Sequence, residues 1–257
     1  MKKILVRIAI GLAVLIVVAL LVVFFSLNSI VKKGVETVGP MITKVDVKLS
    51  AAEISPFSGS GRLKNLVVGN PEPFKAPSSM QFGDMKVGVQ LGSLASDVIV
   101  VNEVNVQDAE ITLEGGLKGN NLSKLLDNIN SSSAEAGNQP KPKNAPPTAG
   151  ASKSSKKFIV KDILIQGTKV HAALDIPGLG TQTFTLPLPP LHLQNIGEAE
   201  HGVTAEQLTQ AIMKPLFENI MTAVTQQVGN LGGSLKGLGT NGINSVGKSI
   251  GNLFKKQ

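Results

Sequence analysis

Residues 100–114 read VVNEVNVQDAEITLE, and this stretch decides the fold that the sequence predicts. Apolar side chains at Val104 and Val106, and again at Ile111 and Leu113, alternate with polar or charged ones. Alternation with period two is typical of a β-strand that has one apolar and one polar face. The stretch therefore predicts two strands joined by a turn, within a sheet that buries one face.

The same pattern recurs 59 residues later, where residues 159–173 read IVKDILIQGTKVHAA. Acidic, apolar and glutamine positions coincide in the two stretches, and a looser third copy covers residues 62–68. Internal similarity of this kind favours an elongating sheet built from repeated hairpins. The alternative, which the sequence leaves open, is that any two amphipathic hairpins resemble each other.

Alternation outside these copies, together with turn clusters rich in Gly, Pro, Asn and Ser, extends the prediction along the chain. The predicted strands number nine and lie near residues 44–54, 60–69, 79–91, 97–106, 109–114, 158–166, 168–176, 181–187 and 190–195. The predicted fold class is therefore mainly β with minor α, with a repeated antiparallel sheet shaped as a groove or a sandwich.

Two helices are predicted among the strands. A short one covers residues 121–129, and a longer one covers residues 204–228, where apolar residues recur every four positions. Thr204 and Gln207 have the spacing of a capping box at the start of the longer helix, and Pro215 predicts a kink within it. The Gly-rich tail after this helix, whose only charges are lysines, is a disordered segment or one that folds on a membrane.

The N-terminal part carries the strongest signal for a location. Residues 8–27 form a run of twenty uncharged residues, fifteen of which are Leu, Ile, Val or Phe. A helix of this length spans about 30 Å, the thickness of the hydrocarbon core of a bilayer. Bulky residues stand where a signal peptidase needs small ones, so we expect a retained anchor rather than a cleaved signal peptide. Basic residues before the run favour a cytoplasmic N-terminus.

Composition argues against several function classes. Residues 32–228 carry 18 basic and 18 acidic side chains, and the chain has no Trp or Tyr, so we expect no nucleic-acid binding. The absence of cysteine excludes disulfides and thiolate chemistry. The three histidines, His171, His192 and His201, show no metal-binding spacing, and no nucleophile motif is present. We therefore expect no enzyme, no metal and no cofactor.

The stretch from Glu53 to Pro71, EISPFSGSGRLKNLVVGNP, together with the N-terminal span, resembles the AsmA-like family of bacterial envelope proteins. Residues 91–94 and 99–116, followed by the helix ending at Ile129, carry the same resemblance. It implies an inner-membrane anchor, a periplasmic body of repeated β-elements and a part in outer-membrane assembly. Larger relatives are thought to shield lipid chains in a hydrophobic groove. The family offers no catalytic residues.

These observations predict a division of the chain into an anchor, a body in two β-rich parts, and C-terminal segments. The expected divisions are 1–31 for a cytoplasmic stub and anchor, 32–129 for the AsmA-like region, 130–157 for a flexible linker or insertion, 158–197 for a second part of the same sheet, 198–228 for an amphipathic helix and 229–257 for the basic tail.

The leading functional hypothesis is a periplasmic protein, tethered to the bacterial inner membrane, that binds or transfers lipid acyl chains in envelope biogenesis. The expected partners are membrane lipids and envelope proteins. The alternative is a scaffold or assembly factor with a closed core and no lipid ligand, in which the same residues are ordinary core. The expected lipid-contacting residues share the apolar face of alternating strands and are Val45, Val47, Leu49, Met85, Val87, Val89, Leu91, Val104, Val106, Ile111 and Leu113.

Overall fold

The structure of the protein is a computed structural model. It describes the backbone of residues 2–137, 156–176 and 180–234, and the side chains of residues 11, 12, 15, 26–132, 156–176 and 180–229. The Gly-rich tail beyond Ser234 and most of the predicted linker, residues 138–155, lie outside this part.

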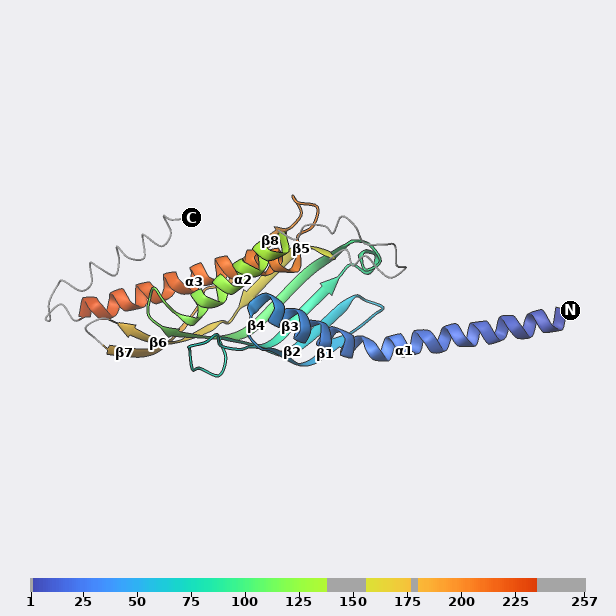
Figure 1. Cartoon of the computed structure of the whole chain (residues 1–257), viewed down its shortest axis with the longest axis horizontal. Coiled ribbons are helices and arrows are strands. Elements are labelled where there is room, and N and C mark those ends of the chain that lie inside the picture. Colours follow the sequence, from blue (N-terminus) through green and yellow to red (C-terminus); the bar gives the residue numbers. More distant parts are fainter. Residues whose placement is uncertain (1, 138–155, 177–179, 235–257) are drawn as a thin grey trace.

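The described chain forms one mostly antiparallel sheet and three α-helices (Figure 1). The helices are α1 (Lys2–Thr43), α2 (Asn121–Gly137) and α3 (Ala205–Ser234), and a short 3-10 turn, η1, covers Leu91–Ser93. The strands are β1 (Val47–Ile54), β2 (Ser60–Val68), β3 (Met80–Val89), β4 (Val98–Gly115), β5 (Lys157–Gln166), β6 (Lys169–Ile176), β7 (Gly180–Pro187) and β8 (Leu191–Ile196). The fold is therefore mixed α/β, which corrects the prediction of a mainly β protein with minor α.

Helix lengths account for this correction. α2 continues to Gly137, eight residues beyond the predicted end of the helix and into the predicted linker. α3 continues to Ser234, and α1 continues past the apolar run to Thr43. The two strands predicted at 97–106 and 109–114 are one strand, β4, of 18 residues. The capping box is confirmed: Thr204 Oγ1 accepts from the amide of Gln207 (3.3 Å), and Gln207 Oε1 accepts from the amide of Thr204 (3.0 Å).

The two copies found in the sequence lie side by side in the sheet. β4 pairs in parallel with β5 and then with β6, and the partners Val98–Lys157 and Glu110–Lys169 are both 59 residues apart. The repeated stretches are therefore aligned in space with the same register as in the sequence. A parallel pair needs a crossover connection, and α2 occupies the chain between β4 and β5. The remaining strands extend the sheet in the order β1-β2-β3-β4-β5-β8, with β7 beyond β6.

Residues with a left-handed backbone conformation line up across the middle of the sheet. Asn65, Asp108 and Gly167 have φ values of +50°, +53° and +67°, which Asn, Asp and Gly tolerate better than other residues. At Gly167 a Cβ would lie 2.7 Å from Asp108 Oδ1 and 3.3 Å from the backbone nitrogen of Asp108, so a larger residue would be crowded as well as strained by the positive φ. Asn65 and Asp108 have no partner in the ladders of β1 to β4. Successive inward-facing residues of β4 are therefore three positions apart here, at Val106 and Ala109, instead of two. Without this step, half of each strand would turn its apolar face to solvent.

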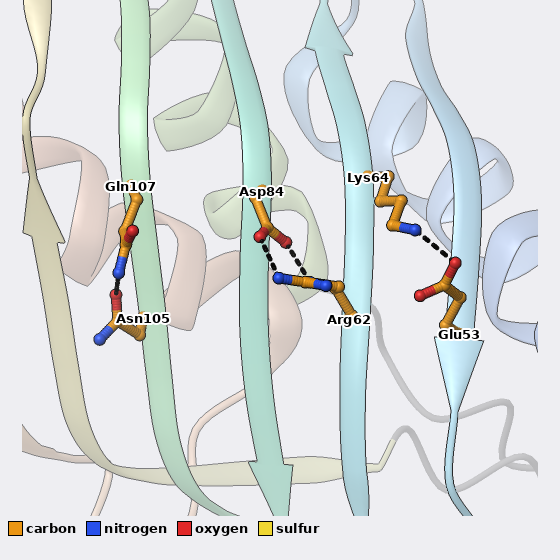
Figure 2. Close-up of polar contacts among 6 residues, drawn as sticks. All are labelled: Glu53, Arg62, Lys64, Asp84, Asn105 and Gln107. Carbon is orange, nitrogen blue, oxygen red and sulfur yellow. Dashed lines mark hydrogen bonds and ion pairs between the residues drawn. The ribbon is translucent and has the colours of Figure 1, made fainter.

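All three helices cover the same face of the sheet, and Figure 2 shows helices behind the strands when the opposite face is viewed. α1 packs on β1, α2 lies between α1 and α3, and α3 contacts β5 and β8. The largest fully buried side chains come from both layers and include Ile111, Leu113, Leu122, Leu125, Leu216 and Ile220. The architecture is a single sheet closed by a helical layer, which corrects the expectation of a groove or a sandwich.

α1 also closes the free edge of β1. Three side chains spaced four residues apart on α1 reach the backbone of this edge strand. They are Asn28, whose Oδ1 accepts from the amide of Ile54 (2.8 Å), Lys32, whose Nζ donates to the carbonyl of Ser50 (3.3 Å), and Glu36, whose Oε1 accepts from the amide of Leu49 (3.1 Å). We call this set the edge clamp. An open strand edge is a template for unwanted pairing, and the clamp removes part of that template.

The N-terminal half of α1 leaves the body and projects beyond one end of the sheet (Figure 1). The backbone of residues 8–27 lies within this helix. Among the residues whose side chains the structure describes, no helix combines the length and the apolar character that a membrane span requires.

Candidate functional site

The predicted lipid-contacting face is for the most part the closed core of the protein. Five of its residues are at most 7% exposed, and three more are partly buried against the same core. The first group is Val47, Leu49, Val106, Ile111 and Leu113; the second is Val45, Met85 and Val104. The helical layer covers these side chains, so in this structure they belong to the core and line no open groove.

The remaining three predicted residues lie toward the end of the sheet from which α1 projects. Val87 and Val89 are partly buried at the end of β3, and Leu91, at the start of η1, is 39% exposed. These three side chains lie outside the hydrophobic core cluster of the protein. The apolar face is thus closed over most of its length and more accessible at the end where β3 leads into the β3–β4 connection.

The opposite face of the sheet is polar (Figure 2). Arg62 and Asp84 form a two-pronged pair across β2 and β3, with distances of 2.9 Å from Nε to Oδ1 and 2.8 Å from the second guanidinium nitrogen to Oδ2. Lys64 pairs with Glu53 on β1. Exposed pairs of this kind contribute little to stability, typically about 0–1 kcal/mol each. They give the part of this face formed by β1, β2 and β3 a charged and hydrated surface.

The polar face also carries a histidine next to a carboxylate. Asp162 Oδ1 accepts from Gln194 Nε2 (3.1 Å) and lies 2.7 Å from His192 Nε2. The hydrogen bond from Gln194, followed by that from His192, lowers the pKa of Asp162. The described residues contain no group of three or more side chains able to hold a metal ion. Both side chains of this pair face open solvent.

A cavity, which we call the distal cavity, lies at the end of the sheet opposite to the projecting part of α1. It has a volume of about 590 Å³ and is lined by the α1–β1 connection, the start of β1, the β2–β3 connection and α2. Lys44, Lys48 and Lys124 line it together with Asp46 and Glu72. No local pattern in the sequence marks this site, because its walls come from segments as far apart as Lys44 and Asn128.

A buried hydrogen-bond network holds the β2–β3 connection in place beside the cavity. Asn121, which is fully buried at the start of α2, accepts from the amide of Glu114 (2.8 Å) and donates to Asn70 Oδ1 and to the carbonyl of Thr112 (both 2.8 Å). Glu114 in turn accepts from Asn70 Nδ2 (3.0 Å) and from the amides of Lys75 and Ala76. The network joins β4, α2 and the β2–β3 connection.

Partial burial of the Glu114 carboxyl opposes its ionisation, but the backbone amides of Lys75 and Ala76, the Asn70 amide and the charge of Lys75 outweigh this effect. Together they lower the pKa of Glu114 below its ordinary value of 4.5. A lowered pKa in the folded state stabilises the protein at pH values above the ordinary one, and this contribution disappears as the pH falls through the folded value.

We therefore expect Glu114→Gln to lower the free energy of unfolding by more at pH 7 than at pH 3, because the stabilisation from the native carboxylate declines as the pH falls toward its lowered pKa. Urea unfolding of both proteins at the two pH values measures this difference. Glu110→Gln, an exposed change on the same strand, is the control and should show no comparable pH dependence. An equal loss at both pH values for Glu114→Gln would show that the charge of this carboxylate is not what stabilises the network.

Comparisons with known proteins add no relative. No protein-family model, no curated protein and no solved structure matches this chain. The resemblance to AsmA-like proteins therefore stays a prediction from the residues that carry it.

Proposed function

We propose that this protein is a membrane-tethered scaffold or assembly factor of the bacterial envelope. In this proposal, residues 8–27 anchor the chain in the inner membrane, the N-terminus is cytoplasmic and the body is periplasmic. The twenty uncharged residues of the run and the resemblance of the following segment to AsmA-like proteins support this location.

One observation carries the proposal: the proposed anchor and the clamp on the sheet edge belong to the same helix, α1. A flexible linker would let the body drift relative to the bilayer, whereas a continuous helix holds it at a set height. Since the edge clamp begins at Asn28, directly after the apolar run, the body begins at the membrane surface. A fixed platform suits a protein that presents a surface to envelope partners.

The closed apolar face favours the scaffold over the lipid carrier. A carrier needs an apolar surface that an acyl chain can reach, and most of the predicted contact residues are covered by α2 and α3 or by α1. The polar face of the sheet offers ion pairs instead. A scaffold needs neither an open groove nor a catalytic group.

A protease site inserted between Leu27 and Asn28 allows both parts of the proposal to be tested on one protein. We expect the intact protein to stay in the membrane pellet after an alkaline wash. We also expect the body, released by the protease and shown to be folded by its melting transition, to carry no stoichiometric phospholipid in native mass spectrometry.

Each part has its own contrary outcome. A mature N-terminus that begins after Leu27 would show that the run is a signal peptide, and the anchor would be lost. One phospholipid bound to each released body would contradict the scaffold proposal and support the lipid-carrier hypothesis. The native protein, which lacks the inserted site, is treated with the same protease as a control for cleavage elsewhere in the chain.

A further inference from the structure

Three large apolar side chains are exposed together at one end of the sheet. Phe57, in the β1–β2 turn, is 85% exposed, and Leu91 and Leu94, in the β3–β4 connection, are 39% and 50% exposed. The two turns touch, because a Cβ on Gly59 would lie 3.2 Å from Leu91 Cδ2. We call these three residues the tip patch. Exposed apolar residues that cluster in this way mark a surface that contacts a partner or a membrane.

The edge clamp fixes the height of the tip patch relative to α1. β1 runs antiparallel to α1, because Leu49 contacts Glu36 whereas Ile54, further along β1, contacts Asn28, which comes earlier in α1. Beyond Ile54 the chain therefore continues alongside the apolar run. Phe57 follows three residues later, so it reaches at most about 10 Å past the level of Asn28. Figure 1 shows the β1–β2 turn and η1 at the end of the sheet from which α1 projects.

The loops that carry the tip patch are held in place by hydrogen bonds. The buried Ser93 donates to the carbonyl of Gln90 (2.6 Å) and accepts from the amide of Val100 (2.9 Å), which fixes η1 against β4. The amide of Val89 donates to the carbonyl of Gly59 (2.8 Å), which joins β3 to the first turn. Leu91 and Leu94 are thus held outward by a fixed loop.

Basic side chains accompany the tip patch. Lys32 and Lys33 follow the apolar run in α1, and Lys156 Nζ donates to the carbonyl of Ser96 in the same loop as Leu94. Lys157 is next to it, and its amide bonds the carbonyl of Asp97, the one acidic residue of this loop. Apolar tips bordered by lysines match the surface of a bilayer with anionic headgroups.

We propose that the tip patch inserts into the lipid headgroup region of the same membrane that holds α1. This inference rests on the proposed anchor, which sets the bilayer surface near Asn28. The body then contacts the membrane at two places, through α1 on one side and through the tips of two β-turns on the other. Two contacts fix its tilt as well as its height, so the polar face and the distal cavity keep one orientation toward the periplasm.

The chain contains no Trp, so single tryptophans report their depth without background. Phe57→Trp and Leu94→Trp place the probe in the tip patch of the full-length protein. Leu15→Trp places it in the apolar run, and Glu72→Trp places it beside the distal cavity. Each variant is reconstituted into vesicles of phosphatidylethanolamine and phosphatidylglycerol, with or without bromine on the acyl chains. We expect blue-shifted emission, and loss of intensity with brominated lipid, at positions 15, 57 and 94 but not at position 72.

The outcomes separate the inference from the anchor on which it rests. Quenching at position 15 without quenching at 57 and 94 overturns the tip patch and leaves the anchor in place. Absence of quenching at position 15 overturns the anchor itself. Blue-shifted emission at 57 and 94 that brominated lipid does not quench shows a protein partner on the patch and also overturns the inference. Circular dichroism of each variant confirms that the body is folded.

Discussion

Val106→Glu should unfold the body of the protein. Val106 is 3% exposed and lies on the helix-facing side of β4, the strand at the centre of the sheet. A carboxylate at this position has no partner and no path to water, and burying it costs several kcal/mol. Typical domains are stable by about 5–15 kcal/mol, so this single change removes much of that margin. Thermal melting followed by circular dichroism measures the loss.

Gln107→Glu is the matched control, since it places the same carboxylate on the next residue of β4, which is exposed on the opposite face. We expect its melting temperature to stay close to that of the native protein. A folded Val106→Glu variant would mean that water reaches this position, and it would return the open lipid groove to consideration. The pair therefore tests whether the apolar face is closed, independently of any ligand.

Asn121→Leu should have the second largest effect. The side chain is fully buried and makes three hydrogen bonds, and leucine can make none of them. The partly buried amide of Glu114 and carbonyl of Thr112 would lose this partner. Unsatisfied groups of this kind cost roughly 1–3 kcal/mol each, and we expect a total loss of about 2–4 kcal/mol in urea unfolding.

Asn102→Leu makes the same chemical change at an exposed position of β4 and should alter the free energy of unfolding by less than about 0.5 kcal/mol. An equally small effect at Asn121 would indicate that water replaces the lost hydrogen bonds. A further measurement follows from the structure: protease digestion of the β2–β3 connection should become faster in Asn121→Leu, because Asn70 loses its contact.

The sequence predicted the strands well because each strand leaves a local signal. Alternating residues marked all eight strands, and the capping residues Thr204 and Gln207 marked the start of α3 to within one residue. The 59-residue repeat predicted a relationship between two stretches, which the structure shows as a parallel ladder with that same offset. That ladder could not be predicted as parallel, since alternation does not encode strand direction.

The covering of the apolar face could not be read from the strands. Period two shows that Val106 and Ile111 share an environment, but a second sheet, a helix and a lipid would all satisfy the same pattern. The answer lies in contacts between distant segments, such as Asn128 Nδ2 with the carbonyl of Thr43 (3.0 Å), which joins α2 to α1. The left-handed residues in the sheet did leave a local sign. Asp108 and Gly167 occupy equivalent places in the two copies, and both residue types favour turns.

The parallel pairing of β4 with β5 has a consequence for the order of folding. β1 to β4 form a meander of neighbouring strands, which can assemble as soon as the chain reaches Gly115. Their partner β5 begins only at Lys157, so during synthesis one edge of β4 stays open until this strand is made. Local contacts form fast and distant ones slowly, and an open edge invites aggregation. The half-made protein is therefore most prone to aggregation between these two points of its synthesis.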